Sequence, residues 1–170
     1  PTERPRVDIS SRYPDTALAT LIVPGCDLGC VFCDTPQLGM PISFSTPALV
    51  RACLRALRPR TTGVFFTGGE PTRLSWLQDL LKEAQNLGFQ RIQMQSHAGP
   101  ASDPDQARGL IDAGLTAIDV PLYGHTAQIH EVVTRTPQSF ERTLGGLQNL
   151  RSLGARSVVH VTLFRSNFPH

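Results

Sequence analysis

The sequence has no long hydrophobic run, almost no lysine and no strong excess of charge of either sign. No apolar stretch approaches the ~20 residues that a membrane-spanning helix needs, so we expect no membrane contact. Lys82 is the only lysine, and a net charge of +2 gives no basic patch of the kind that binds nucleic acid. The first residues also lack the basic and apolar segments of a secretory signal, and we therefore expect a cytoplasmic protein.

The composition is that of one folded domain. A length of 170 residues falls within the usual size of a domain, and 40% hydrophobic residues exclude a disordered chain. Residues 1–16 are mostly polar and contain three prolines, so we expect a linker or one short added strand there. Residues 17–170 are expected to form the folded core.

Short apolar runs alternate with helical patterns along this core. The β-prone runs cover residues 17–23, 63–67, 91–95, 116–120 and 157–163. Several are almost continuously apolar, which is typical of strands that are covered on both faces. The helical patterns, with apolar residues three or four positions apart, cover residues 47–57, 74–87, 105–113 and 138–153.

Prolines and glycines mark the ends of these helices. A residue that caps helices precedes a proline at three places, Thr46, Asp103 and Thr136. A glycine, which favours the left-handed exit from a helix, follows three of the patterns, at Gly88, Gly114 and Gly154. A repeated order of strand, helix and glycine predicts an α/β fold with a parallel sheet, either a barrel or an open sheet.

Unusual residues follow four of the predicted strands. These segments are the cysteine-rich residues 24–33, then Gly68-Gly69-Glu70-Pro71, then Ser96-His97, and finally Tyr123-Gly124-His125. Because binding residues gather at the carboxyl ends of parallel strands, we expect these four segments to lie at one edge of the sheet. The sequence therefore predicts a functional site at that edge.

Three cysteines, Cys26, Cys30 and Cys33, lie close together in a C-x3-C-x2-C pattern. Their spacing and odd number argue against disulfide bonds among them. A structural zinc site needs a fourth ligand, and Cys53 is expected to be a small buried residue on the apolar stripe of its helix. Three thiolates without a fourth suit an iron–sulfur cluster with one open iron, and a zinc site is the alternative.

Two further features of this edge have more than one interpretation. Gly68 and Gly69 either form a tight turn or, together with Glu70, hold the ammonium group of a ligand. Three histidines fall near the predicted edge, and each is either a proton donor or an ordinary loop residue: His97, His125 and His130.

The pattern Cys26-x3-Cys30-x-Phe32-Cys33 after a first strand, with Gly68-Gly69-Glu70-Pro71 after a second, resembles the radical S-adenosylmethionine (radical SAM) superfamily. The similarity runs from about residue 17 to residue 167. It implies a parallel βα array that forms a partial TIM-type barrel. The superfamily core has six strands, of which about five are expected here, so we expect the core to be incomplete at its C-terminus.

The resemblance also implies roles for particular residues. Three cysteines would hold a [4Fe-4S] cluster whose open iron binds S-adenosyl-L-methionine (AdoMet), namely Cys26, Cys30 and Cys33. The methionine ammonium of AdoMet would be received by the segment Gly68, Gly69, Glu70 and Pro71. The adenine would lie near the backbone beside Phe32, and candidate contacts to the methionine or ribose are Ser96 and Asn167.

The function implied by this resemblance is radical catalysis. One electron would cleave AdoMet to a 5′-deoxyadenosyl radical, which would abstract hydrogen from a peptide, a natural-product precursor or a cofactor precursor. A reductase or a flavodoxin- or ferredoxin-type protein would supply the electron. The alternative is a non-catalytic α/β module that binds a cluster or zinc.

Overall fold

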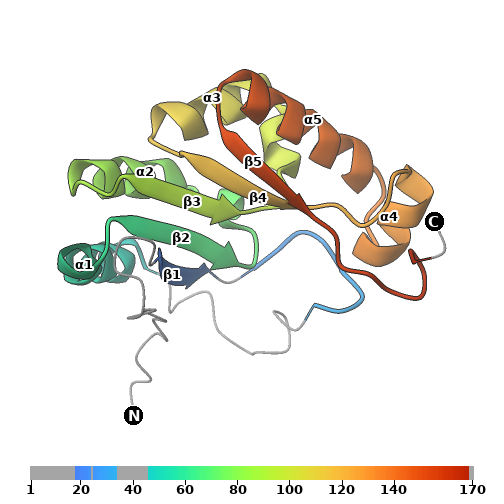
Figure 1. Cartoon of the computed structure of the whole chain (residues 1–170), viewed down its shortest axis with the longest axis horizontal. Coiled ribbons are helices and arrows are strands. Elements are labelled where there is room, and N and C mark those ends of the chain that lie inside the picture. Colours follow the sequence, from blue (N-terminus) through green and yellow to red (C-terminus); the bar gives the residue numbers. More distant parts are fainter. Residues whose placement is uncertain (1–17, 24, 34–45, 169–170) are drawn as a thin grey trace, which may run out of the picture.

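A computed structural model describes residues 18–23, 25–33 and 46–168, so the predicted linker or strand at 1–16 lies outside the described residues. Five parallel strands form one sheet in the order β1-β2-β3-β4-β5 (Figure 1). The strands are β1 (Leu18–Val23), β2 (Gly63–Gly68), β3 (Arg91–Gln95), β4 (Ala117–Pro121) and β5 (Arg156–His160). The predicted α/β fold with a parallel sheet is confirmed.

Helical segments connect the strands, as neighbouring parallel strands require. The α-helices are α1 (Pro47–Leu57), α2 (Leu77–Asn86), α3 (Pro104–Asp112), α4 (Ala127–Thr134) and α5 (Ser139–Ser152). The described part of the chain also contains three short 3-10 helices, η2 (Arg58–Arg60), η3 (Pro71–Arg73) and η4 (Gly99–Ser102). Among these described helices, none is both long enough and apolar enough to span a membrane.

Alternate side chains of the strands form the core on one face of the sheet. The fully buried strand residues include Val64, Phe66, Ile92, Met94, Ile118 and Val120. They share one cluster with buried residues of the helices, among them Leu54, Leu80, Leu81, Leu110 and Leu150. Each such side chain stabilises the fold by about 1.5–3 kcal/mol relative to exposure. The helices therefore cover this face and leave the carboxyl ends of the strands to the connecting loops.

Two of the three predicted helix caps are confirmed. Thr46 accepts a hydrogen bond from the N–H of Leu49, and Asp103 accepts one from the N–H of Asp105. Thr136 does not cap a helix, because the chain turns through Gln138 in a left-handed conformation (φ +63°) before α5 begins. The three predicted exit glycines do have positive φ angles, at Gly88, Gly114 and Gly154.

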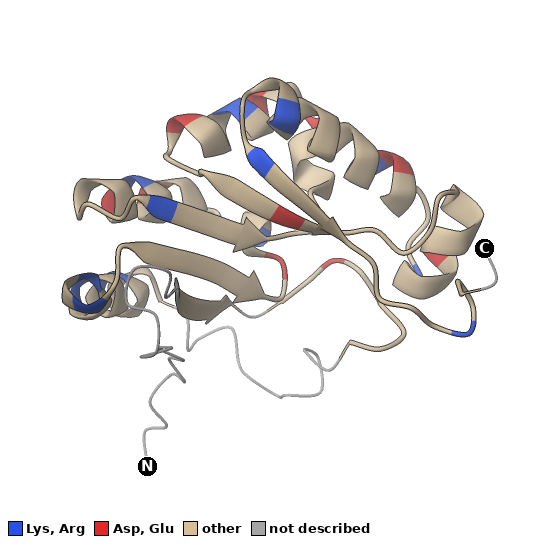
Figure 2. Cartoon of the chain, viewed as in Figure 1, with Lys and Arg blue, Asp and Glu red and all other residues tan. Residues whose placement is uncertain are grey.

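Some predicted boundaries were wrong. Helix α2 begins three residues later than predicted, because the preceding residues form η3 and a turn. The fifth strand ends at His160 rather than at residue 163, and α4 was not predicted as a helix. Basic and acidic positions are both scattered over the described helices, although the charged residues of α1 are only arginines (Figure 2).

Candidate functional site

The cysteine loop (residues 25–33) follows β1 and carries three free thiols, those of Cys26, Cys30 and Cys33. Burial, followed by the negative charges of the other two thiolates, raises the pKa of Cys30 to about 11. The three groups are thus close enough to repel one another when ionised. A metal centre relieves that repulsion by binding the thiolates, and the fourth cysteine, Cys53, instead packs against the core from α1.

The C-terminus of α4 holds one side of the cysteine loop. The N–H of Gly29 donates to the carbonyl of Thr134 at 3.0 Å, and the N–H of Val31 donates to the carbonyl of Val133 at 2.9 Å. The last carbonyls of a helix have no partner within the helix, so they are available to a neighbouring loop. Helix α4 therefore positions the loop.

The turn after β2 holds the other side of this loop at very close range. The N–H of Gly69 donates to the carbonyl of Val23, and that of Glu70 donates to the carbonyl of Gly25, both at 2.7 Å. A Cβ atom on Gly69 would lie 2.0 Å from the carbonyl oxygen of Gly25. Glycine is therefore required at position 69 because the two chain segments touch there.

Glu70 is almost completely buried, and hydrogen bonds occupy both of its carboxylate oxygens. Its Oε1 accepts from the N–H of Thr72 at 3.0 Å, from the Thr72 hydroxyl at 2.6 Å and from the Ser96 hydroxyl at 2.7 Å. Its Oε2 accepts from the N–H of His97 at 3.0 Å. The carboxylate thus joins the turn after β2 to the end of β3.

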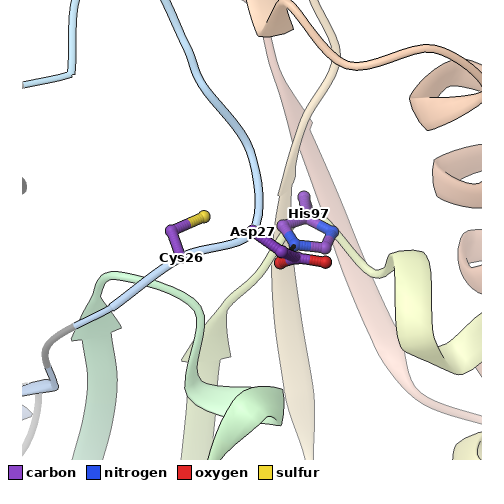
Figure 3. Close-up of side chains that lie close together, drawn as sticks. All are labelled: Cys26, Asp27 and His97. Carbon is purple, nitrogen blue, oxygen red and sulfur yellow. Dashed lines mark hydrogen bonds and ion pairs between the residues drawn. The ribbon is translucent and has the colours of Figure 1, made fainter.

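His97 lies between two carboxylates, and Figure 3 shows it beside Cys26 and Asp27. Its Nε2 is 2.9 Å from Oδ1 of Asp27 and 3.2 Å from Oε2 of Glu70. The N–H of Gly99 donates to Nδ1 at 3.0 Å, which places the proton of a neutral ring on Nε2.

The charge on this imidazole is subject to opposing influences. Burial alone would lower the pKa of His97, but Cys26, Glu70 and Asp27 together raise it to about 9. The Gly99 N–H opposes a second proton at Nδ1. Burial would also raise the pKa of Asp27, whereas the hydrogen bond and charge of His97 lower it. The bond from Nε2 to Asp27 is present in either charge state.

An aromatic group lies beside the cysteine loop. The ring of Phe32 stacks on Phe164 with centroids 4.9 Å apart and meets Tyr123 edge-on at 5.4 Å. Phe32 keeps 40% of its surface exposed, so part of the ring is open to a ligand. Burial and the three nearby thiolates raise the pKa of Tyr123, which keeps its phenol protonated.

Asn167 connects the segment after β5 to the segment after β4. Its side-chain N–H groups donate to the carbonyls of Tyr123 and Thr162, both at 2.9 Å, and its Oδ1 accepts from the N–H of Phe164. These bonds use both amide hydrogens. Asn167 therefore holds Phe164 where it stacks on Phe32.

The structure brings the predicted site residues to one edge of the sheet. The cysteines, Phe32, the Gly-Gly-Glu-Pro turn and Ser96 adjoin one another through the contacts above, and Pro71 is buried at the start of η3. His130 is buried, and its Nδ1 accepts from the N–H of Tyr123 at 3.2 Å. His125 is exposed in the loop before α4.

Sequence reasoning missed a row of polar side chains on the sheet face opposite the core. The Thr67 hydroxyl donates to Gln95 at 2.7 Å, and Nε2 of Gln95 lies 3.3 Å from Nε2 of His160. Asp119 is the partner of Gln95 in the β3–β4 register. We call Thr67, Gln95, Asp119 and His160 the inner row. The signal was present, because polar residues alternate with apolar ones in strands 91–95 and 117–121.

Comparison with known proteins identifies the family. The model of the radical SAM superfamily matches residues 20–168. The chain belongs to the radical SAM superfamily. Membership in this enzyme superfamily implies its two cofactors, a [4Fe-4S] cluster and AdoMet, and the three clustered thiols fit the cluster.

Curated relatives are longer than this chain. An AdoMet-dependent heme synthase from Oleidesulfovibrio alaskensis is 24% identical over 90% of this chain and 39% of its own length. A 7,8-dihydro-6-hydroxymethylpterin dimethyltransferase from Methanocaldococcus jannaschii is 29% identical over 88% of this chain and 31% of its own length. The chain thus spans less than half the length of either relative.

Solved structures share the fold. SuiB from Streptococcus suis, bound to the precursor peptide SuiA, aligns with a TM-score of 0.67 at 19% identity over 82% of this chain and 31% of its own. The protein anSMEcpe with bound AdoMet aligns with a TM-score of 0.62 at 16% identity over 82% of this chain and 42% of its own. The predicted partial barrel is thereby confirmed.

Proposed function

We propose that this chain is the AdoMet-cleaving core of a radical SAM enzyme in which Cys26, Cys30 and Cys33 hold the [4Fe-4S] cluster. When bound, the cluster and AdoMet would supply one-electron chemistry, namely reductive cleavage of AdoMet followed by hydrogen abstraction from substrate. The observation that carries the proposal is the group of three free, partly buried cysteines on one loop, which α4 and the turn after β2 hold by hydrogen bonds.

In this proposal, the backbone of the turn at Gly68, Gly69, Glu70 and Pro71 receives the methionine ammonium of AdoMet. Two facts support the backbone over the Glu70 side chain: both carboxylate oxygens already accept hydrogen bonds, and Gly68 is exposed. Ser96 then acts chiefly by holding Glu70, to which it donates. A direct contact from Ser96 to AdoMet remains a prediction.

The adenine is proposed to lie beside Phe32, whose ring is partly exposed and fixed from behind by Phe164 and Tyr123. Asn167 supports this arrangement by bonding the backbone of both Phe164 and Tyr123. Because both of its amide hydrogens are used there, we propose that Asn167 orders the adenine side of the site and offers AdoMet no N–H.

The substrate is proposed to be polar. The inner row places a hydroxyl, an amide, a carboxylate and an imidazole on the face of the sheet that the core does not cover. Hydrogen-bonding groups of this kind suit a peptide or a cofactor precursor better than an apolar substrate. The names of the similar proteins, which include a heme synthase, a pterin dimethyltransferase and a complex with a precursor peptide, support both classes.

The electron is proposed to come from a reductase or from a flavodoxin- or ferredoxin-type donor, in the cytoplasm. The partial exposure of the three cysteines supports transfer from an external protein.

AdoMet cleavage tests the proposal. The chain is reconstituted anaerobically with iron and sulfide and reduced with dithionite, and 5′-deoxyadenosine is measured after AdoMet is added. We expect about four iron atoms per chain and formation of 5′-deoxyadenosine. Cys30→Ala should abolish both and leave a folded α/β domain by circular dichroism, whereas the matched control Cys53→Ala should retain both. Zinc in place of iron, or a full cluster in Cys30→Ala, would contradict the proposal.

A further inference from the structure

We propose that His97 is a positioning residue for the cluster: through Asp27 it fixes the first cysteine of the loop against the ends of β2 and β3. This inference rests on the proposed function, since it concerns how the chain holds the cluster assigned to Cys26, Cys30 and Cys33. It assigns His97 no contact with AdoMet or substrate.

The first argument is where the cysteine loop is anchored. Backbone hydrogen bonds fix the loop at Gly25 and again at Gly29 and Val31. Between these anchors, the Asp27 side chain reaches the sheet by bonding His97 at 2.9 Å. The neighbouring Cys26 is the cysteine whose Sγ lies within 4.8 Å of the ligand atoms of both Asp27 and His97 (Figure 3).

The second argument is that contacts other than the one with Asp27 already fix the position of the imidazole. The side chain of His97 is 6% exposed, its Nδ1 accepts from the N–H of Gly99, and the backbone N–H of His97 donates to Glu70. A Cβ atom on Gly99 would lie 2.8 Å from Nδ1, so the ring and the Gly99 backbone touch. Asp27 is less buried, with 27% of its side chain exposed. The fixed partner is therefore His97, and Asp27 docks on it.

The third argument is that Nε2 serves two carboxylates at once. It lies 2.9 Å from Asp27 and 3.2 Å from Glu70, which itself bonds the Gly25 carbonyl through its backbone N–H. Without the Nε2 hydrogen, the two carboxylates would face each other across the ring position, and the charged group left beside Asp27 would be the exposed Arg142, whose guanidinium lies 3.9 Å from Oδ2. Repulsion would then push Asp27, and Cys26 with it, away from the sheet.

Two substitutions of His97 distinguish a hydrogen-bond donor at the position of Nε2 from a side chain that only fills the space. The amide nitrogen of Gln can reach the position of Nε2 and keep a donor between Asp27 and Glu70. The shorter Asn can accept from Gly99 in place of Nδ1 but cannot reach Asp27. We therefore compare His97→Gln, His97→Asn and His97→Ala, with His125→Ala as the control because His125 is exposed in a loop at the same edge.

The readouts are cluster retention and reduction potential, neither of which depends on turnover. Each protein is reconstituted, and the concentration of a strong iron chelator that removes half of the cluster is measured. Loss of a residue that orients a metal ligand typically weakens metal binding about 10–100-fold, and we expect this for His97→Ala and His97→Asn. His97→Gln and His125→Ala should stay close to wild type. The potential should shift in His97→Ala and His97→Asn, because Cys26 is then no longer fixed by Asp27, and it should stay close to wild type in His97→Gln.

A double-mutant cycle tests the route through Asp27. If His97 acts through Asp27, then Asp27→Ala should weaken retention as His97→Ala does, and the double variant should be little worse than either. Retention in His97→Ala equal to wild type, or equal losses in the Gln and Asn variants, would overturn the inference. If His97→Ala fails to fold, the comparison of Gln with Asn still decides. Failure of the wild-type chain to take up a cluster would instead refute the proposed function.

Discussion

Replacing Gly69 by alanine should separate the cysteine loop from the turn after β2. The new Cβ would lie 2.0 Å from the carbonyl oxygen and 2.6 Å from the carbonyl carbon of Gly25, and backbone atoms cannot move aside as a flexible side chain can. The contact is relieved only if the two segments move apart. That movement breaks the hydrogen bonds from Gly69 to Val23 and from Glu70 to Gly25.

The expected loss can be calculated from these two bonds. A backbone hydrogen bond contributes about 0.5–1.5 kcal/mol, so the free energy of unfolding should fall by about 1–3 kcal/mol. If the two segments instead stay together, the unrelieved contact strains the folded state and lowers the free energy of unfolding by a similar amount. The free energy of unfolding is measured by urea denaturation of the metal-free protein, and cluster retention is measured with a chelator.

The matched control is Gly145→Ala. Gly145 lies inside α5, where a Cβ atom would be 3.4 Å from the Cβ of Ser102, an ordinary contact. Alanine favours a helix interior, so this variant should be more stable than wild type by about 0.5–1 kcal/mol. If Gly69→Ala unfolds at the same urea concentration as wild type and keeps its cluster equally well, the close contact between Gly69 and Gly25 does not stabilise the fold or the cluster site, and the reasoning is refuted.

Two further predictions concern buried polar side chains. Burial lowers the pKa of His130 from its ordinary value of 6.5, so below that pH the unfolded chain gains a proton that the folded chain does not. The free energy of unfolding should then fall by up to about 1.4 kcal/mol per pH unit until the folded pKa is reached, a slope that His130→Gln should remove in a pH series of urea titrations. An unchanged slope would place the acid sensitivity elsewhere. Glu70→Gln should lower the free energy of unfolding by about 1–3 kcal/mol, because an amide N–H would face the donors of His97. Stability equal to wild type would mean that these bonds are not needed.

Much of the fold could be predicted because proline and glycine act locally. The caps at Thr46 and Asp103 and the positive φ angles of Gly88, Gly114 and Gly154 follow from the conformations that these residue types favour. Thr136 has the same sequence signal as the two confirmed caps but does not act as one. Its hydroxyl instead lies 3.4 Å from the N–H of Gly29, a residue more than a hundred positions away. Contacts between residues so far apart in the sequence cannot be predicted from the local sequence pattern.

The candidate site likewise has features that could be predicted from the sequence and features that could not. The cysteine spacing and the Gly-Gly-Glu turn identified the edge of the sheet, because motifs at strand ends converge there. The partners of those residues could not be predicted, since they depend on how loops meet. Glu70 is predicted, with Gly68 and Gly69, to hold a ligand ammonium, and that role stays a prediction. The structure adds that its carboxylate joins Thr72, Ser96 and His97. His97 was one of three equivalent candidates until its distance to Asp27 distinguished it.

The most direct test of the central claim is the electron paramagnetic resonance spectrum of the reduced, reconstituted chain with and without AdoMet. The claim is that three cysteines hold a cluster whose fourth iron is open to AdoMet. We predict a [4Fe-4S]⁺ signal that changes shape when AdoMet is added, and no such signal in Cys30→Ala. A cluster signal that is indifferent to AdoMet, or a chain that binds zinc and no iron, would contradict the claim.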